Sequence, residues 1–199
     1  MLAEAARSRL PRVLVASDGR HAVHAPPELD AGVLVRDTDL AALVHRVGSD
    51  CPPDAVDIDS IAGLGGDDAA VDFITSRLGI RIVLTRRPQL ALRAAEHGRL
   101  GLVHIYGYDS TGMARSLESH PRSDRVGSVL SPGLVIAHLR PDELAQLPRP
   151  LLAYGLIDEL EDAEACLALA DAIVVRPVIA ARLAAARLAA APEEVRVGS

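Results

Sequence analysis

The sequence predicts an α/β fold, a single small TIM-like (β/α)8 barrel with a parallel sheet. Three observations predict it. Eight short apolar runs rich in β-branched residues recur along the chain, helical patterns follow most of them, and all eight units fit within 199 residues. Buried parallel strands read as near-continuous apolar runs, and repeated strand–helix units imply a parallel sheet. A doubly wound open sheet is the alternative, but eight units in so short a chain favour closure into a barrel.

The predicted strands share this apolar character and cover 12–17, 32–36, 55–59, 81–85, 102–107, 126–130, 151–155 and 172–176. Helical periodicity is clearest at 69–78, 88–98 and 160–170, and the Ala-rich segment 178–191 should form the last helix. The connection 18–31 is rich in Pro, His and Asp and has no helical period, so we expect an irregular loop there.

Helix starts carry their own signals. Pro88 and Pro177 stand where a first helical residue is expected. Asp158 precedes an apolar run and has Glu161 three residues later, which is typical of a capping box. We see no linker, so residues 1–199 should form one barrel domain, with its core at about 11–190 and a frayed tail at 192–199.

Composition limits the class of protein. Hydrophobic residues make up 49% and aromatic residues 2%, so Ala, Val, Leu and Ile must fill the core. No apolar run is long enough to span a membrane, and the N-terminal stretch lacks a signal-peptide core, so we expect a cytoplasmic protein without membrane contact. Cys51 and Cys166 are far apart and should be reduced structural thiols. The histidines show no metal-ligand spacing, so we predict no metal and no cofactor.

The charge balance bears on partners. The formal net charge is −6, which argues mildly against a strong nucleic-acid binder. All 21 basic residues are arginine, the side chain best suited to forked phosphate contacts.

The active face of such a barrel is built from the loops that follow the strands. Carboxylates and arginines dominate those positions here. Asp37, Asp109 and Asp158 could serve the site or could simply cap helices. Asp59 ends a predicted strand and precedes a Gly-rich loop, so a functional role competes evenly with a structural one.

Phosphate sites in barrels commonly use the loops after the last two strands. The first of these loops contains Gly155, Leu156 and Ile157, where a glycine lets backbone N–H groups approach an anion. The second begins at Arg176, which could contact phosphate directly or could pair with an acidic neighbour at the barrel rim. No nucleophile–base pair stands out, so the sequence predicts a binding protein rather than an enzyme.

Six short motifs follow one another along the chain: RDTDL (36–40), VDIDSIAGL (56–64), LTRR (84–87), YDST (108–111), VLSPGLV (129–135) and AYGLI (153–157). In this order, from about residue 30 to about 183, they resemble the glycerol-3-phosphate-responsive antiterminator family. Each motif is weak alone, and the ordered set is moderately specific.

The resemblance implies a barrel that binds glycerol 3-phosphate and, when liganded, acts on leader mRNA to allow transcription past a terminator. The family-like positions that it carries over are Asp59, Thr85, Arg86, Asp109, Pro132, Gly133, Gly155, Leu156 and Ile157. The chain also departs from the family pattern: Tyr154 replaces a glycine, and Arg176-Pro177-Val178 replaces a Thr/Ser-rich segment. Asp57 and Ala62 stand in place of two histidines, and Ser131 looks like an insertion before the Pro-Gly pair.

The candidate RNA-binding residues are the arginines in and around the fourth strand–helix unit, Arg77, Arg81, Arg87, Arg93 and Arg99, with Arg86 shared with the ligand site. The main prediction is therefore a transcription antiterminator that responds to glycerol 3-phosphate or a similar phosphorylated small molecule. The alternatives are a diverged barrel that binds such a metabolite without an RNA role, and an enzyme acting on it. The sequence leaves open whether the chain forms a homo-oligomer.

Overall fold

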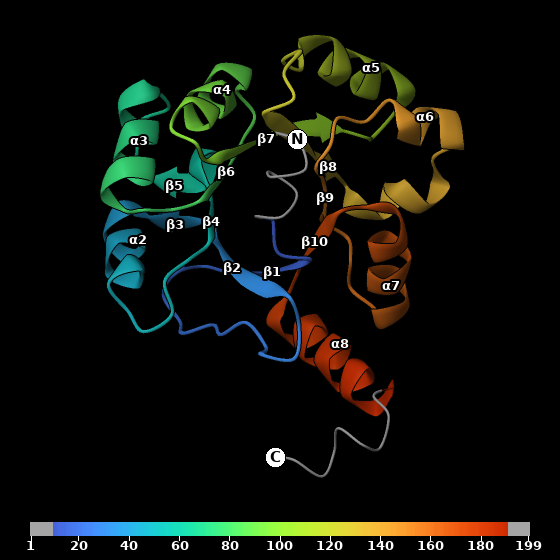
Figure 1. The fold of residues 1–199 in the computed structure, drawn as a ribbon, viewed down its shortest axis with the longest axis horizontal. Helices are drawn as coiled ribbons and strands as arrows, with labels where there is room; N and C mark the ends of the chain where they lie inside the picture. The colour runs from blue at the N-terminus through green and yellow to red at the C-terminus, as the bar shows by residue number, and fades with distance from the viewer. Residues whose placement is uncertain (1–9, 191–199) are drawn as a thin grey trace.

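The computed structural model describes residues 10–190 and contains a closed barrel of eight parallel strands surrounded by helices (Figure 1). Around the barrel the strands follow the order β1-β10-β9-β8-β7-β6-β4-β2. They are β1 (Val13–Ser17), β2 (Ala31–Val35), β4 (Ala55–Asp57), β6 (Ile82–Thr85), β7 (Leu100–Tyr106), β8 (Val126–Ser131), β9 (Leu151–Tyr154) and β10 (Ala172–Val175). The parallel barrel predicted from the sequence is therefore confirmed, and the open-sheet alternative is wrong for this chain.

The helices follow the strands in sequence and cover the outside of the barrel (Figure 1). They are α2 (Leu40–Val47), α3 (Asp68–Asp72, continued by a π-helical turn over Phe73–Arg77), α4 (Pro88–Glu96), α5 (Ser110–Ser119), α6 (Pro141–Ala145), α7 (Leu160–Leu169) and α8 (Pro177–Ala190). Short 3-10 segments lie at Ile58–Ser60 and Gly133–His138, and β3 (Thr38–Asp39) pairs with β5 (Ile61–Ala62) beyond the barrel strands. Among the described helices, none is both long and apolar enough to cross a bilayer.

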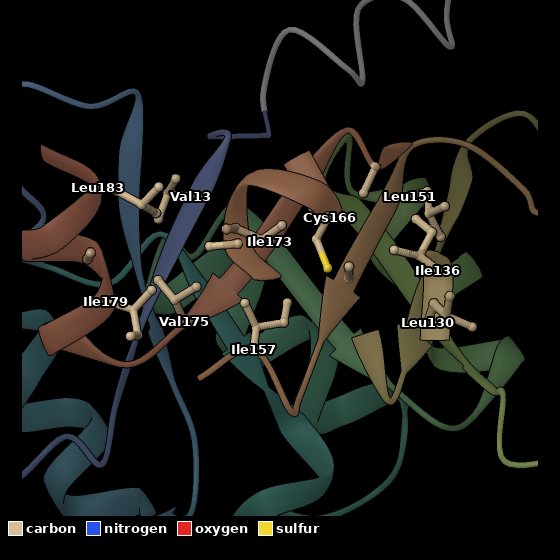
Figure 2. Packing of buried hydrophobic residues seen from close by; sticks show 14 of the residues in the cluster. Val13, Leu130, Ile136, Leu151, Ile157, Cys166, Ile173, Val175, Ile179 and Leu183 are labelled. Atoms are coloured by element: carbon tan, nitrogen blue, oxygen red, sulfur yellow. The ribbon is translucent and has the colours of Figure 1, made fainter. Parts of the chain in front are cut away.

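The core has an inner and an outer part because strand side chains alternate in direction. Leu14, Leu34, Leu84, Leu102 and Leu152 belong to one buried cluster whose members recur at every second strand position and fill the barrel. Larger clusters lie between the strands and the helices. Figure 2 shows the largest of these clusters. In it, strand residues such as Val175 and Leu130 pack with helix residues such as Ile179 and Cys166.

Most local predictions hold. The strand bounds agree with those expected to within two residues, 18–31 has neither helix nor strand apart from the first residue of β2 at its end, and Pro88 and Pro177 begin α4 and α8. Cys51 and Cys166 are free thiols. The tail at 192–199 lies outside the described residues.

Two cap predictions are wrong. Asp158 does not cap α7, because its carboxylate faces Arg176 in the next loop with Oδ1 3.0 Å from Nη2, and Glu159 takes the N-cap position. Asp37 does not cap α2 either. Asp39 does so, accepting a hydrogen bond of 2.8 Å from the Ala42 N–H. The third candidate, Asp109, does cap its helix, α5, through a 2.7 Å bond from the Gly112 N–H.

Candidate functional site

A pocket of about 520 Å³ opens at the carboxyl ends of the barrel strands. Its lining comes from loops that follow β2, β4, β6, β7, β8 and β9, and from the last inward-facing residues of these strands. The lining residues are Arg36, Asp37, Asp57, Asp59, Ser60, Arg86, His104, Tyr106, Tyr108, Ser131, Pro132, Tyr154, Gly155 and Leu156. We call this the larger pocket.

The strand alternation explains why its floor is polar. Two residues beyond three of the leucines that fill the barrel interior, the chain carries a polar side chain on the same face: Arg36 after Leu34, His104 after Leu102, and Tyr154 after Leu152. Asp57 stands in the same relation to Ala55. A layer of charged and aromatic side chains therefore lies directly above the aliphatic core.

Asp59 is a buried carboxylate of this pocket, with a side chain only 4% exposed. The 3-10 turn after β4 brings it against the end of β6, where Oδ2 accepts hydrogen bonds from the Thr85 hydroxyl (3.0 Å) and the Arg86 N–H (2.5 Å). The guanidinium groups of Arg86 and Arg87 lie 3.5 and 3.7 Å from the carboxylate. Its Oδ1 is buried and has no hydrogen-bond partner among the described residues.

Arg36 lies between the larger pocket and a second, smaller pocket that is described below. Its guanidinium carbon is 5.0 Å from the ring centroid of Tyr154, a cation–π arrangement, and it forms an ion pair with Asp37. Asp37 has a positive φ of 50°, and its N–H donates to the Ser60 hydroxyl over 3.0 Å. The Arg36 Nε is buried, and no described residue accepts a hydrogen bond from it.

Burial changes the protonation of the floor. Burial, with a smaller contribution from the charge of Asp59, raises the pKa of Asp57 to about 6. Burial lowers the pKa of His104 to about 4, so this imidazole is neutral at pH 7. Burial also raises the pKa of Tyr154, which keeps that hydroxyl protonated. At neutral pH the floor therefore presents one ionised carboxylate, Asp57, beside neutral rings.

A smaller pocket of about 190 Å³ adjoins the first and shares Arg36, Tyr154, Gly155 and Leu156 with it. The rest of its lining is Ala16, Ile157, Asp158, Val174, Val175 and Arg176. Gly155 has a φ of 91°, which only glycine adopts without strain, and a Cβ there would meet open space. The backbone after β9 is therefore open to a bound molecule at this point.

The structure brings most of the predicted ligand residues to these two pockets. Asp59 and Arg86 line the larger pocket, Ile157 and Arg176 line the smaller one, and Gly155 and Leu156 line both. Two residues lie behind the lining. Thr85 is buried and holds Asp59, and Gly133 is buried with its N–H donating to the Gly155 carbonyl over 2.9 Å. Asp109 lines neither pocket.

The predicted RNA-binding arginines do not form one patch. Arg87 lies at the N-cap of α4, near the pockets. Arg81 and Arg99 precede β6 and β7, at the opposite end of the barrel, where Arg81 pairs with Asp54 and Arg99 donates to the Thr75 carbonyl over 3.1 Å. Arg93 on α4 is held by both oxygens of Asp72, at 2.8 and 2.9 Å, and Arg77 ends the turn that follows α3.

Asp57, His104, Tyr106 and Tyr108 also line the larger pocket, but none of them was among the site residues predicted from the sequence. The alternation of side chains along a strand could have predicted them. A polar residue at the next inward-facing position, two residues beyond the last buried aliphatic residue, must lie at the barrel mouth. No three His, Cys, Asp or Glu side chains within residues 10–190 gather as a metal-binding group.

Comparison with known proteins agrees with this picture. The sequence profile of the family described as "Glycerol-3-phosphate responsive antiterminator" matches residues 33–176. A crystal structure of a glycerol uptake operon antiterminator-related protein from Thermotoga maritima MSB8 has a TM-score of 0.66 and 21% identity, and the match covers 85% of this chain and 97% of that one. The glycerol uptake operon antiterminator regulatory protein from Listeria monocytogenes str. 4b F2365 has a TM-score of 0.63 and 20% identity, over 81% of this chain and 90% of that one. No curated protein matches the sequence significantly.

Proposed function

Since this chain belongs to the glycerol-3-phosphate responsive antiterminator family, we propose that it is a ligand-responsive RNA-binding antiterminator that regulates genes of glycerol metabolism. Its ligand is glycerol 3-phosphate or a similar phosphorylated small molecule. In this proposal the liganded protein acts on a leader mRNA and allows transcription past a terminator. The role is one of binding and regulation rather than of catalysis.

The observation that carries the proposal is the gathering of Arg36, Arg86 and Arg176 around two adjoining pockets at the barrel mouth. The protein as a whole has a net charge of −6, so a local group of guanidinium side chains is what could hold a phosphate. Family membership supports glycerol 3-phosphate as that phosphate compound.

We place the phosphate group in the smaller pocket, between Gly155 and Arg176. The open backbone at Gly155 and the N-terminus of α8 both favour an anion there. The Arg176 side chain is 63% exposed and faces Asp158, so it can turn toward a phosphate while keeping one donor on the carboxylate. The glycerol hydroxyls then extend past Tyr154 toward Asp57, which accepts hydrogen bonds when ionised.

Thermal unfolding with and without glycerol 3-phosphate tests the ligand. At 100 times its dissociation constant, the ligand should stabilise the protein by roughly 2.7 kcal/mol. Arg176→Ala should lose much of that gain, whereas Arg187→Ala, in the helix that follows Arg176 but away from the pocket, should keep it. An unchanged melting temperature at millimolar glycerol 3-phosphate would count against this ligand, and equal responses of the two variants would remove Arg176 from the site.

The acidic net charge favours a second candidate, a barrel that binds the same metabolite without an RNA role. A titration with the protein's own upstream leader RNAs, with and without glycerol 3-phosphate, separates the two. Ligand-dependent binding supports the antiterminator. Absence of binding at low salt in both states leaves the metabolite-binding barrel.

A further inference from the structure

All three tyrosines of the chain lie at the larger pocket, in a protein with one phenylalanine and no tryptophan. Tyr106 and His104 are two residues apart at the end of β7, and Tyr108 follows after two more, so their side chains share one side of the chain. The rings of Tyr108 and Tyr106 are 6.0 Å apart with an interplanar angle of 9°, and those of Tyr106 and His104 are 6.1 Å apart at 17°. Near-parallel rings therefore run from the rim of the pocket to its floor.

Packing does not account for this arrangement. The core of the protein is aliphatic, and Tyr108 is 73% exposed, so its ring buries little surface. Tyr106 is half-buried and presents its ring to the pocket. An open aromatic face at the mouth of a pocket is a surface on which another flat ring can stack.

The larger pocket also contains an exposed positive charge beside the aromatic rings. Arg86 lines the same pocket, and its side chain is 58% exposed. A flat stacking surface beside an exposed guanidinium group suits a ligand that carries an aromatic ring and a phosphate. The pocket volume of about 520 Å³ also falls within the range of about 300–1,000 Å³ that is usual for ligands of this size, whereas the smaller pocket, at about 190 Å³, does not.

We propose that the larger pocket is a nucleotide site, in which a base stacks on Tyr108 and Tyr106 and the attached phosphate contacts Arg86. The inference rests on the proposed function and deepens it, since single-stranded RNA is recognised largely through unstacked bases placed on aromatic side chains. The same nucleotide unit could reach the pocket as a free nucleotide or as one residue of an RNA strand. The smaller pocket remains the place of the phosphorylated metabolite.

The first experiment compares AMP with ribose 5-phosphate, which has the phosphate but no base, by calorimetric titration. AMP should bind more tightly by roughly 5- to 150-fold, the usual effect of one stacked base. Tyr108→Phe keeps the ring and should keep this preference, and Tyr108→Ala should lower AMP affinity toward that of ribose 5-phosphate. Because Tyr108 is exposed, neither change threatens the fold. Equal binding of the two compounds, or full AMP affinity in Tyr108→Ala, would overturn the proposal.

Proton NMR gives a direct readout, because the tyrosine ring signals of this protein come from this pocket alone. AMP should shift the signals of Tyr106 and Tyr108, and ribose 5-phosphate should shift them much less. Ring signals that stay unchanged at saturating AMP would contradict the site.

A six-residue oligoadenylate identifies the source. Hexamer binding that is tighter than AMP binding, and that weakens in Tyr108→Ala, supports a nucleotide within RNA, while AMP binding without gain for the hexamer supports a free nucleotide. If neither binds, the nucleotide site is overturned. Glycerol 3-phosphate stabilisation and leader-RNA titration, run on the same protein, show separately whether the proposed function stands.

Discussion

At the scale of single residues, the floor of the larger pocket places two titratable groups in opposite situations. Asp57 and His104 are both held near the top of the barrel interior, and burial favours the neutral form of each. The pKa of Asp57 rises to about 6, and the pKa of His104 falls to about 4. The two shifts occupy the same pH window but act on stability with opposite signs.

The signs follow from proton binding. Between pH 4 and 6 the folded state holds a proton on Asp57 that the unfolded chain has lost, so this group lowers the free energy of unfolding as pH rises. Between pH 4 and 6.5 the unfolded chain holds a proton on His104 that the folded state has lost, so this group raises the free energy of unfolding as pH rises. In the wild-type protein the two contributions largely cancel.

Single substitutions should therefore reveal opposite pH slopes. Asp57→Asn removes the Asp57 contribution, so its stability should rise relative to wild type as pH goes from 4 to 6. His104→Gln removes the His104 contribution, so its stability should fall relative to wild type as pH goes from 4 to 6.5. Each change should be on the order of 3 kcal/mol. Urea unfolding at four pH values measures this, and variant curves that run parallel to the wild-type curve would contradict both pKa shifts.

At the scale of elements, Asp109 illustrates how a sequence position after a strand can serve a helix instead of a ligand. Its carboxylate accepts from the Gly112 N–H over 2.7 Å at the start of α5, and it lines neither described pocket. Asp109→Ala should cost about 1 kcal/mol of stability, the usual value of an N-cap, and Asp109→Asn, which can still cap, should cost much less.

The same variants test the ligand role of Asp109. Stabilisation by glycerol 3-phosphate should be the same in Asp109→Ala as in wild type, once the lower starting melting temperature is subtracted. If Asp109→Ala is no longer stabilised by glycerol 3-phosphate, Asp109 contributes to ligand binding and this prediction is wrong.

The contact between α4 and β7 depends on a glycine. A Cβ on Gly101 would collide with the backbone carbonyl of Ala91, so the absence of a side chain lets the helix approach the strand closely. Gly101→Ala should destabilise the protein by roughly 1–3 kcal/mol, because the helix must move away. Gly48 at the end of α2 is the control, since its φ is −80° and a Cβ there would meet atoms no nearer than 3.6 Å. Denaturant unfolding should show little change for Gly48→Ala, and equal losses for both variants would contradict the packing argument.

At the scale of the whole molecule, the distribution of arginines decides how RNA could be held. Arg86 and Arg87 lie at the mouth of the barrel, whereas Arg81 and Arg99 lie at its opposite end. A single RNA contact surface at the mouth would therefore use the first pair and not the second.

Salt dependence of leader-RNA binding tests this division. Each phosphate contact that is removed should flatten the plot of log affinity against log salt by somewhat under one unit. We expect a flatter slope for Arg87→Gln, a substitution that leaves Arg86 in the larger pocket unchanged. We expect an unchanged slope for Arg81→Gln and for Arg99→Gln. A flatter slope for Arg81→Gln or Arg99→Gln would indicate that RNA binds at the opposite end of the barrel.

The sequence by itself determined the strand–helix order, the closed parallel barrel and the end of the barrel that carries the site. These follow from apolar runs of strand length, helical periods between them and the low number of residues per unit, all of which are local properties. It also located Gly155, Asp59, Arg86 and Arg176 near the pockets, because residues that follow parallel strands must meet at one end of a barrel.

Only the tertiary structure decided which of those residues share a pocket and which serve the fold. Asp158 pairs with Arg176 in the next strand–helix loop instead of capping the helix that follows it. The register between neighbouring strands also placed Arg36, Asp57 and His104 above the aliphatic interior. Partner choice and strand register depend on contacts between residues far apart in the chain, and a local sequence pattern does not contain that information.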